Sequence, residues 1–243
     1  MATSSGLVMQ LDARCEIERL ARAHDLDVAP LLGTLAPFLD TYLELALDDA
    51  GFEVITGGVG NACGLASASR VLGLGAPARS AFLAAAAAYP DAMLGLKVDA
   101  AGRSAPTLYH RPMMPIAEGL RLLGAIEPNV VRALGARLAP ARTLYGLGFT
   151  TTSAGALRVK TYVLDDVAGR IGFRSVRATA HGVEAEARSY EAEAPIESSL
   201  SVARRAAIVL GVTTLGHVAR SAGRGAKVYV ERIGAIATDP AAR

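Results

Sequence analysis

A strand–turn–strand unit repeats five times along the chain, and this repeat limits the possible folds more than any other feature. Each copy has an apolar strand, a turn that contains glycine, and a second strand, as tight hairpin connections require. The copies are residues 42–56, 93–111, 143–164, 170–192 and 214–233. Five such hairpins predict ten antiparallel strands.

Helical patterns separate most of the hairpins. They lie at residues 15–26, 62–88, 116–139 and 196–212. Between the third and fourth hairpins the sequence DDVAG is too short for a helix. A closed barrel removes the unpaired sheet edges, and helices cover its apolar outer face. We therefore predict an α+β fold, a ten-stranded antiparallel β-barrel surrounded by α-helices. No composition break divides the chain, so residues 1–243 are predicted to form a single domain.

The strands alternate between apolar and polar residues. Residues 43–47 put leucines on one face and Glu44 on the other, and residues 94–99 put apolar residues opposite Lys97 and Asp99, because neighbouring strand residues point to opposite faces. If helices cover the outer face, the polar side chains line the lumen. The residues predicted to face it on this basis are Glu44, Lys97, Arg158, Lys160 and Tyr162.

A tyrosine recurs in the second strand of the hairpins. Four of the seven tyrosines occupy this equivalent position, and three of the four follow a cation by two residues. The tyrosines are Tyr109, Tyr162, Tyr190 and Tyr229, and the cations are Lys160, Arg188 and Lys227. Two interpretations stay open at this point. The residues line an enclosed polar space, or the strands are amphipathic with solvated charges and tyrosine follows its strand propensity.

The overall composition excludes several classes of protein. The net charge is +2 and no cluster of Lys and Arg occurs, which predicts no nucleic-acid partner. The apolar run at residues 81–89 is too short to span a bilayer, so no membrane partner is predicted. Two cysteines and no signal peptide predict a reduced, cytoplasmic protein.

No motif for a metal or a dinucleotide is complete. The Asp48–Asp49 and Asp165–Asp166 pairs lack the third aspartate of a DDxxD motif, and we interpret them as turn residues. The four histidines lack metal-ligand spacing. The glycine-rich residues 57–64 lack the spacing of a dinucleotide-binding loop and predict a loop before a helix that Asn61 caps. No metal site is predicted.

The RVKTY run at 158–162 resembles the Arg-x-Lys-x-Tyr strand of the ABBA-type aromatic prenyltransferases, which include the dimethylallyltryptophan synthases. LELALD (43–48) is similar to the first-strand motif of that family, and GLKVD (95–99) to the strand that carries a lumen lysine. ARSYE (187–191) and AKVYV (226–230) match the last two second strands. The likeness covers roughly residues 40–235.

The resemblance implies five repeated helix–helix–strand–strand units around a lumen that holds an allyl diphosphate and an aromatic acceptor, either a small molecule or a peptide. The implied reaction transfers a prenyl group, dimethylallyl or longer, to that acceptor by electrophilic alkylation. Glu44 maps to the glutamate that acts on the acceptor. The implied diphosphate ligands are Lys97, Arg158, Lys160, Arg188 and Lys227. The tyrosines implied to shield the allyl cation are Tyr109, Tyr162, Tyr190 and Tyr229. No cofactor is required, and Mg²⁺ is compatible with diphosphate binding.

Two positions depart from the family pattern. Glu53 stands where family members usually carry a basic residue, and Thr107 stands where they usually carry a lysine. These departures leave two alternatives to the prenyltransferase open: a non-catalytic ligand-binding barrel with the same fold, and another enzyme on a related repeat barrel.

Overall fold

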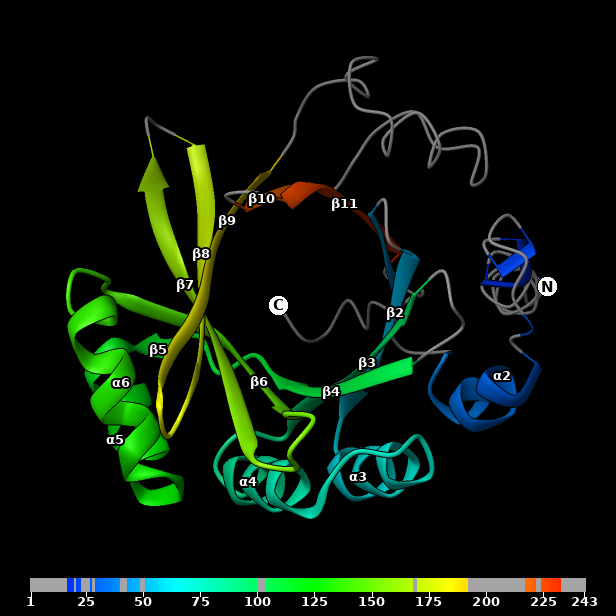
Figure 1. Cartoon of the computed structure of the whole chain (residues 1–243), viewed down its shortest axis with the longest axis horizontal. Coiled ribbons are helices and arrows are strands. Elements are labelled where there is room, and N and C mark those ends of the chain that lie inside the picture. Colours follow the sequence, from blue (N-terminus) through cyan, green and yellow to red (C-terminus); the bar gives the residue numbers. More distant parts are fainter. Residues whose placement is uncertain are drawn as a thin grey trace, which may run out of the picture.

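The computed structural model describes residues 17–19, 21–22, 27, 29–39, 43–48, 51–99, 104–167, 170–191, 217–221 and 224–232. Its strands curl into a ring, with helices on the outside (Figure 1). The strands are β1 (Leu43–Asp48), β2 (Gly51–Val59), β3 (Asp91–Asp99), β4 (Ser104–His110), β5 (Met114–Pro115), β6 (Thr143–Thr151), β7 (Leu157–Val167), β8 (Arg170–Thr179), β9 (Gly182–Glu191), β10 (His217–Ser221) and β11 (Arg224–Arg232). The helices are α2 (Ala29–Leu35), the short 3₁₀ helix η1 (Ala36–Phe38), α3 (Ala62–Val71), α4 (Ala76–Ala86), α5 (Ile116–Ile126) and α6 (Pro128–Leu138).

The described strands form one antiparallel sheet in the order β4-β3-β2-β1-β11-β10-β9-β8-β7-β6-β5. Strand β4 also pairs with β6, with Leu108 opposite Phe149 and His110 opposite Leu147. This pairing joins the two ends of the order and closes the ring, while the two-residue β5 attaches to β6 beside it. Closure leaves no long unpaired edge in the described part of the sheet.

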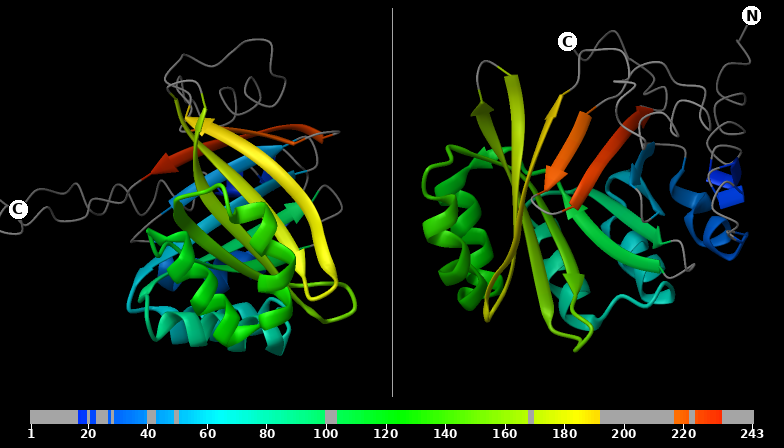
Figure 2. Two further views of the ribbon diagram at one scale, coloured as in Figure 1. Left: turned by 90° about the vertical axis from the view of Figure 1, so that its left-hand side faces the viewer. Right: turned by 45° about the horizontal axis from the view of Figure 1, so that its top comes forward.

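The main hydrophobic core lies between the ring and the helices. Helix α3 packs on β3 and β4, α4 on β4 and β6, and α6 on β8 and β9, and the views in Figure 2 place these helices on the outer side of the sheet. Phe82 of α4, Leu134 of α6 and the strand residues Leu94, Leu108 and Phe149 are fully buried in this core. The apolar strand face therefore points outward, as the alternation predicted.

Proline and a capping side chain fix where the outer helices begin. Helices α4 and α6 each carry proline in the first turn, where the missing N–H costs no hydrogen bond. Glu127 precedes α6, and its side chain accepts a hydrogen bond from the Asn129 N–H at 3.4 Å. Among the described helices, none is both long and apolar enough to cross a membrane.

The predicted fold class, an antiparallel barrel-like sheet with surrounding helices, is confirmed, whereas the strand count of the whole chain stays a prediction. The pattern at 62–88 forms two helices, α3 and α4, and the pattern at 116–139 forms α5 and α6. Helix α2 and strand β5 were not predicted. The predicted helix at 196–212 lies outside the described residues.

Two local predictions were wrong. Residues 57–59 are not part of a loop but the end of β2, paired with β3. Asp165 and Asp166 are not turn residues, because β7 continues through them opposite Gly172 and Ile171 of β8. In both cases the neighbouring strand supplies backbone partners, which sequence-local turn preferences do not take into account.

Candidate functional site

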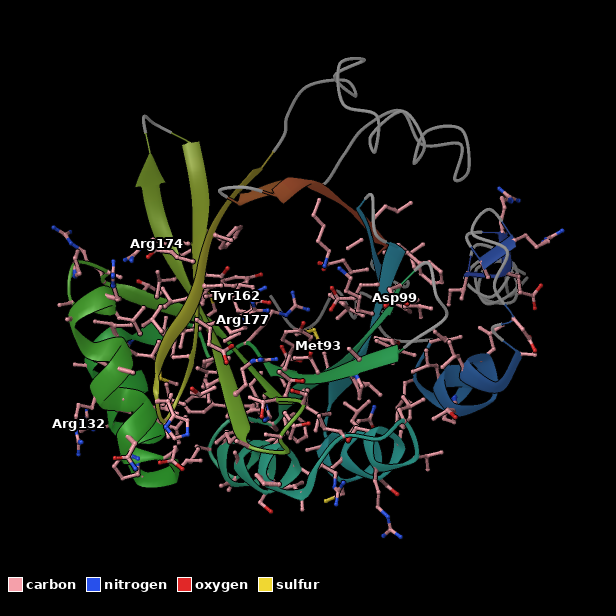
Figure 3. All side chains as sticks on the ribbon, viewed as in Figure 1. Met93, Asp99, Arg132, Tyr162, Arg174 and Arg177 are labelled. Carbon is pink, nitrogen blue, oxygen red and sulfur yellow. The ribbon has the colours of Figure 1, made fainter. Side chains whose placement is uncertain are left out.

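The face of the sheet that points away from the outer core carries charged side chains from strands that are far apart in the sequence. Glu53 of β2 lies opposite Lys97 of β3, and Lys160 of β7 lies opposite Arg177 of β8. Tyr109 of β4 is on the same face, next to β6. In Figure 3, Tyr162 and Arg177 lie toward the interior of the ring and Arg174 lies toward α6. We call the interior surface the inner face.

Glu53 lies at the centre of the best-defined cluster on the inner face. The residue is only 6% exposed. One oxygen, Oε2, forms an ion pair with Lys227 Nζ of β11, and the other, Oε1, accepts a hydrogen bond from the Tyr109 hydroxyl at 3.0 Å. Burial raises the pKa of Glu53, but the charges of Lys227 and Lys160 and the two hydrogen bonds outweigh it, so the net pKa is lowered. Glu53 is therefore anionic near neutral pH.

Two tyrosine rings and a lysine extend this cluster across β4 and β7. The rings of Tyr109 and Tyr162 lie 6.2 Å apart, centroid to centroid, at 58°. Lys160 Nζ lies 4.5 Å from the centroid of the Tyr162 ring, within the range of a cation–π contact. Burial and the negative charge of Glu53 raise the pKa of Tyr162. Its hydroxyl stays protonated and can donate a hydrogen bond.

Two strand glycines make room for the Tyr109 ring. A Cβ at Gly95 of β3 would lie 2.5 Å from Tyr109 Cε2, and a Cβ at Gly148 of β6 would lie 2.9 Å from its Cε1. Glycine weakens an isolated strand, and its presence in a strand often marks such a close approach. The missing side chains at these two positions therefore leave the space that the Tyr109 phenol occupies between β3 and β6.

Glu44, the candidate base, is also on the inner face. It lies on β1 opposite Ile55 of β2 and Glu231 of β11, and it is 8% exposed. Its charge contributes to the raised pKa of Tyr162, which places the carboxylate within electrostatic reach of that ring. A buried carboxylate near tyrosine rings and lysines can accept a proton from a bound molecule.

Arg158 and Arg177 share one carboxylate at the end of the ring. Arg158 Nε lies 2.6 Å from Glu184 Oε2, and Arg177 Nε lies 3.5 Å from the same atom. Glu184 also lines a shallow pocket of about 340 Å³ between the β6–β7 and β8–β9 turns. Arg158 is thus held at the rim, whereas Lys160 and Tyr162 lie further along β7.

The backbone register separates Arg188 and Tyr190 from the other predicted site residues. Arg188 pairs with Arg174, whose guanidinium bonds to the Arg137 carbonyl of α6 on the outer side, and Tyr190 pairs with Gly172. The cause is a bulge in β9: Arg177 pairs with Ala185 and Ala178 with Val183, so Glu184 is an extra residue. One extra residue moves all later positions of a strand to the other face. The structure therefore does not bring these two positions to the inner face.

Tyr229 and His110 occupy opposite faces of the ring. The register position of Tyr229 on β11 is opposite Ala46 of β1 and belongs to the inner face. The His110 side chain lies in the outer core, where its ring stacks on Phe82 at 4.3 Å between centroids. No group of three or more His, Cys, Asp or Glu suited to a metal ion occurs within the part of the chain that the structure describes.

Sequence reasoning missed three of the residues in these clusters. Glu53 was noted only as a departure from the family pattern, and Arg177 and Glu184 were not noted. Arg177 lies on a first strand of a hairpin, whereas the recurring motif was sought on second strands. The Arg-x-x-Arg spacing of residues 174 and 177 puts the two arginines on opposite faces, and this signal could have identified Arg177 as an inner-face cation.

No protein-family model matches the chain, and no curated protein matches its sequence. Solved structures do match its fold. A 6-dimethylallyltryptophan synthase from Micromonospora olivasterospora, in complex with DMASPP and Trp, is 14% identical with a TM-score of 0.56, covering 91% of this chain and 96% of that one. AnaPT from Neosartorya fischeri is 12% identical with a TM-score of 0.56, covering 92% and 93%. A 5-dimethylallyltryptophan synthase from Streptomyces coelicolor is 13% identical with a TM-score of 0.55, covering 98% and 99%.

At these identities the likeness shows the fold. The chain shares the architecture of prenyltransferase structures over most of its length, and the resemblance noted in the sequence is confirmed at that level. Fold alone does not assign a reaction.

Proposed function

We propose that the chain transfers a prenyl group, dimethylallyl or longer, from an allyl diphosphate to an aromatic acceptor by electrophilic alkylation. The observation that carries the proposal is the cluster on the inner face. Cations, phenol rings and two buried carboxylates from β1, β2, β4, β7 and β11 converge there. A likeness of fold to structures named as dimethylallyltryptophan synthases supports it.

The proposed donor site uses the inner-face cations. Lys97, Lys160 and Lys227 supply point charges to the diphosphate oxygens, and Arg158 and Arg177 supply paired N–H donors at the rim. In this proposal Arg177 binds the diphosphate in place of Arg188, which the sequence predicted as a diphosphate ligand. These protein cations offset the charge of the leaving group without requiring a metal ion, and Mg²⁺ bound to the diphosphate would add to its binding.

In the proposed reaction, the allylic C–O bond breaks and its electron pair leaves with the diphosphate. The ring faces of Tyr109 and Tyr162 stabilise the allyl cation by about 0.5–2 kcal/mol each and exclude water from it. A carbon of the electron-rich acceptor attacks the cation and forms the new C–C bond. Glu44 then accepts the proton that the acceptor releases. The acceptor is an aromatic small molecule or a peptide side chain.

Glu44→Gln tests this assignment. The variant removes the base but keeps the size of the side chain and one acceptor oxygen, so we expect turnover with dimethylallyl diphosphate to fall by roughly 10² or more. Any change in diphosphate affinity should be a gain, because the substitution also removes a negative charge from the inner face. The assay measures product formation with a panel of indoles, phenols and aromatic peptides. Glu118→Gln on α5, where the carboxylate bonds to Tyr89 outside the ring, is the matched control. Unchanged turnover in Glu44→Gln would refute the role of Glu44.

A second candidate is a ligand-binding barrel without catalysis. Glu53 and Thr107, at positions where cations were expected, favour it, because each lowers the positive charge available for a diphosphate. The same panel distinguishes the two candidates. A wild-type protein that binds allyl diphosphate but forms no product with any acceptor would leave the binding function as the better account.

A further inference from the structure

Glu53 has no part in the proposed reaction, although it is a buried carboxylate of the inner face. Both of its oxygens are engaged, one by the Lys227 ammonium and one by the Tyr109 hydroxyl. It also interacts electrostatically with Lys160. These three donors are the ones that the proposed function assigns to the diphosphate or to the allyl group that it carries.

A carboxylate and a phosphate compete for such donors. Each offers anionic oxygens to the same N–H and O–H groups, and an ammonium that already bonds to a carboxylate has less attraction left for a second anion. Glu53 is 6% exposed, so water does little to screen its charge. For a phosphate that approaches Lys227, the negative charge of Glu53 therefore offsets much of the attraction of the ammonium.

The charge balance of the inner face also disfavours a diphosphate. Among the inner-face side chains that the structure describes, five cations lie with five carboxylates. The cations are Lys97, Arg158, Lys160, Arg177 and Lys227, and the carboxylates are Glu44, Glu53, Asp91, Asp99 and Glu184. These charges leave no positive excess. A diphosphate ester carries about three negative charges and a monophosphate ester about two. The extra charge of the diphosphate is therefore poorly compensated.

We infer that Glu53 is a specificity-determining residue. Its charge lowers the affinity of the inner face for diphosphate groups, so that this affinity approaches the affinity of the same face for monophosphate groups. An allyl monophosphate then competes with an allyl diphosphate for the same site. The identity of the prenyl donor rests on the proposed function, whereas the effect of Glu53 on anion binding does not depend on any reaction.

Calorimetric titration of the full chain with inorganic phosphate and inorganic diphosphate, at constant ionic strength and pH 7.5, tests the inference. We expect wild type to bind diphosphate less than about tenfold more tightly than phosphate, because one unit charge a few ångströms away shifts an affinity by this order. Glu53→Gln keeps the acceptor for Tyr109 and removes the charge. We expect it to bind diphosphate about tenfold or more tighter than wild type, with a smaller gain for phosphate.

Two variants locate the effect. Glu118→Gln makes the same substitution outside the ring and should leave both affinities unchanged. Glu53→Gln combined with Lys227→Gln removes the ion pair and should lose the gain, because the released ammonium causes it. A gain that survives in the double variant would overturn the inference, as would equal or weaker diphosphate binding by Glu53→Gln.

If Glu53→Gln does not fold, the ratio of the wild-type affinities for diphosphate and phosphate still tests the inference. Diphosphate binding more than about a hundredfold tighter than phosphate binding in wild type would overturn the inference, and so would no binding of either anion. The proposed function fails separately. Wild type that forms no prenylated product but shows the expected ratio, together with the expected gain in Glu53→Gln, would refute prenyl transfer and support the role of Glu53.

Discussion

The two faces of the ring differ in composition and in packing. The outer face is apolar and packs under α3, α4 and α6, and its only buried imidazole among the described residues, His110, is enclosed by Phe82 and Phe149. The inner face carries charges and phenols, and Glu53 holds Lys227 and Tyr109 there. Because of this difference, we expect outer-face substitutions to change stability and inner-face substitutions to change ligand binding.

The largest expected effect is on the outer face. Phe82 is fully buried, stacks on His110 and meets the Phe149 ring edge-on at 6.5 Å. Phe82→Ala leaves a cavity between α4 and the sheet, and we expect it to lower the free energy of unfolding by about 3–5 kcal/mol. Denaturant titration measures the change.

Leu83→Ala is the matched control for Phe82→Ala, because Leu83 is 40% exposed on the same helix and should change the free energy of unfolding by about 0.5 kcal/mol or less. The folded Phe82→Ala protein should bind inorganic diphosphate with wild-type affinity. A loss of affinity that parallels the loss of stability would show that the two faces are not separable.

Lys160→Ala should have the next largest effect, which we expect on the affinity of the inner face for diphosphate. The ammonium lies over the Tyr162 ring on the inner face, and removing a charged donor to an anion costs about 1.5–3 kcal/mol. We expect diphosphate affinity to fall by roughly tenfold to a hundredfold in calorimetry. Arg132→Ala removes the same charge from the exposed side of α6 and should leave the affinity unchanged. Equal losses in the two variants would mean that net charge, rather than the site, attracts the anion.

The sequence predicted the outer face better than the inner face, for a physical reason. Period-two alternation decides which residues of one strand share a face, and this placed Glu44, Lys97 and Lys160 together. It does not decide the register between strands. The bulge at Glu184 of β9 moves Arg188 and Tyr190 to the other face, and nothing in a single strand signals it. The Lys227–Glu53 pair joins residues 174 positions apart, which only the closed sheet brings together.

A smaller effect concerns the outer face and pH. Burial lowers the pKa of His110 below 6.5, although the carbonyls of Phe82, Asp91 and Tyr89 and the Asp91 charge oppose this. The unfolded chain therefore binds a proton on this imidazole more readily than the folded chain. Stability from this group is fully present above about pH 6.5 and falls as the pH is lowered through the unfolded pKa toward the folded one.

Urea titration of His110→Gln between pH 8 and pH 5 measures this contribution. The variant should lose less stability than wild type over that range, because its side chain has no proton to bind. His181→Gln, at an exposed turn, should keep the wild-type pH dependence. A His110→Gln slope equal to that of wild type would contradict the assignment, since the imidazole would then be protonated equally in both states.

The smallest expected effect separates ring from hydroxyl on the inner face. Tyr162→Phe keeps the ring beneath Lys160 Nζ and removes the hydroxyl, which burial and the Glu53 charge keep protonated. A neutral hydrogen bond contributes about 0.5–1.5 kcal/mol, so diphosphate affinity should fall by roughly threefold to tenfold. Tyr89→Phe removes a hydroxyl that donates to Glu118 at 2.8 Å outside the ring and should not change that affinity. If Tyr162→Phe binds diphosphate like wild type, the phenol acts through its ring face alone. The inner face would then hold the anion by its cations, and the tyrosines would serve only the allyl cation.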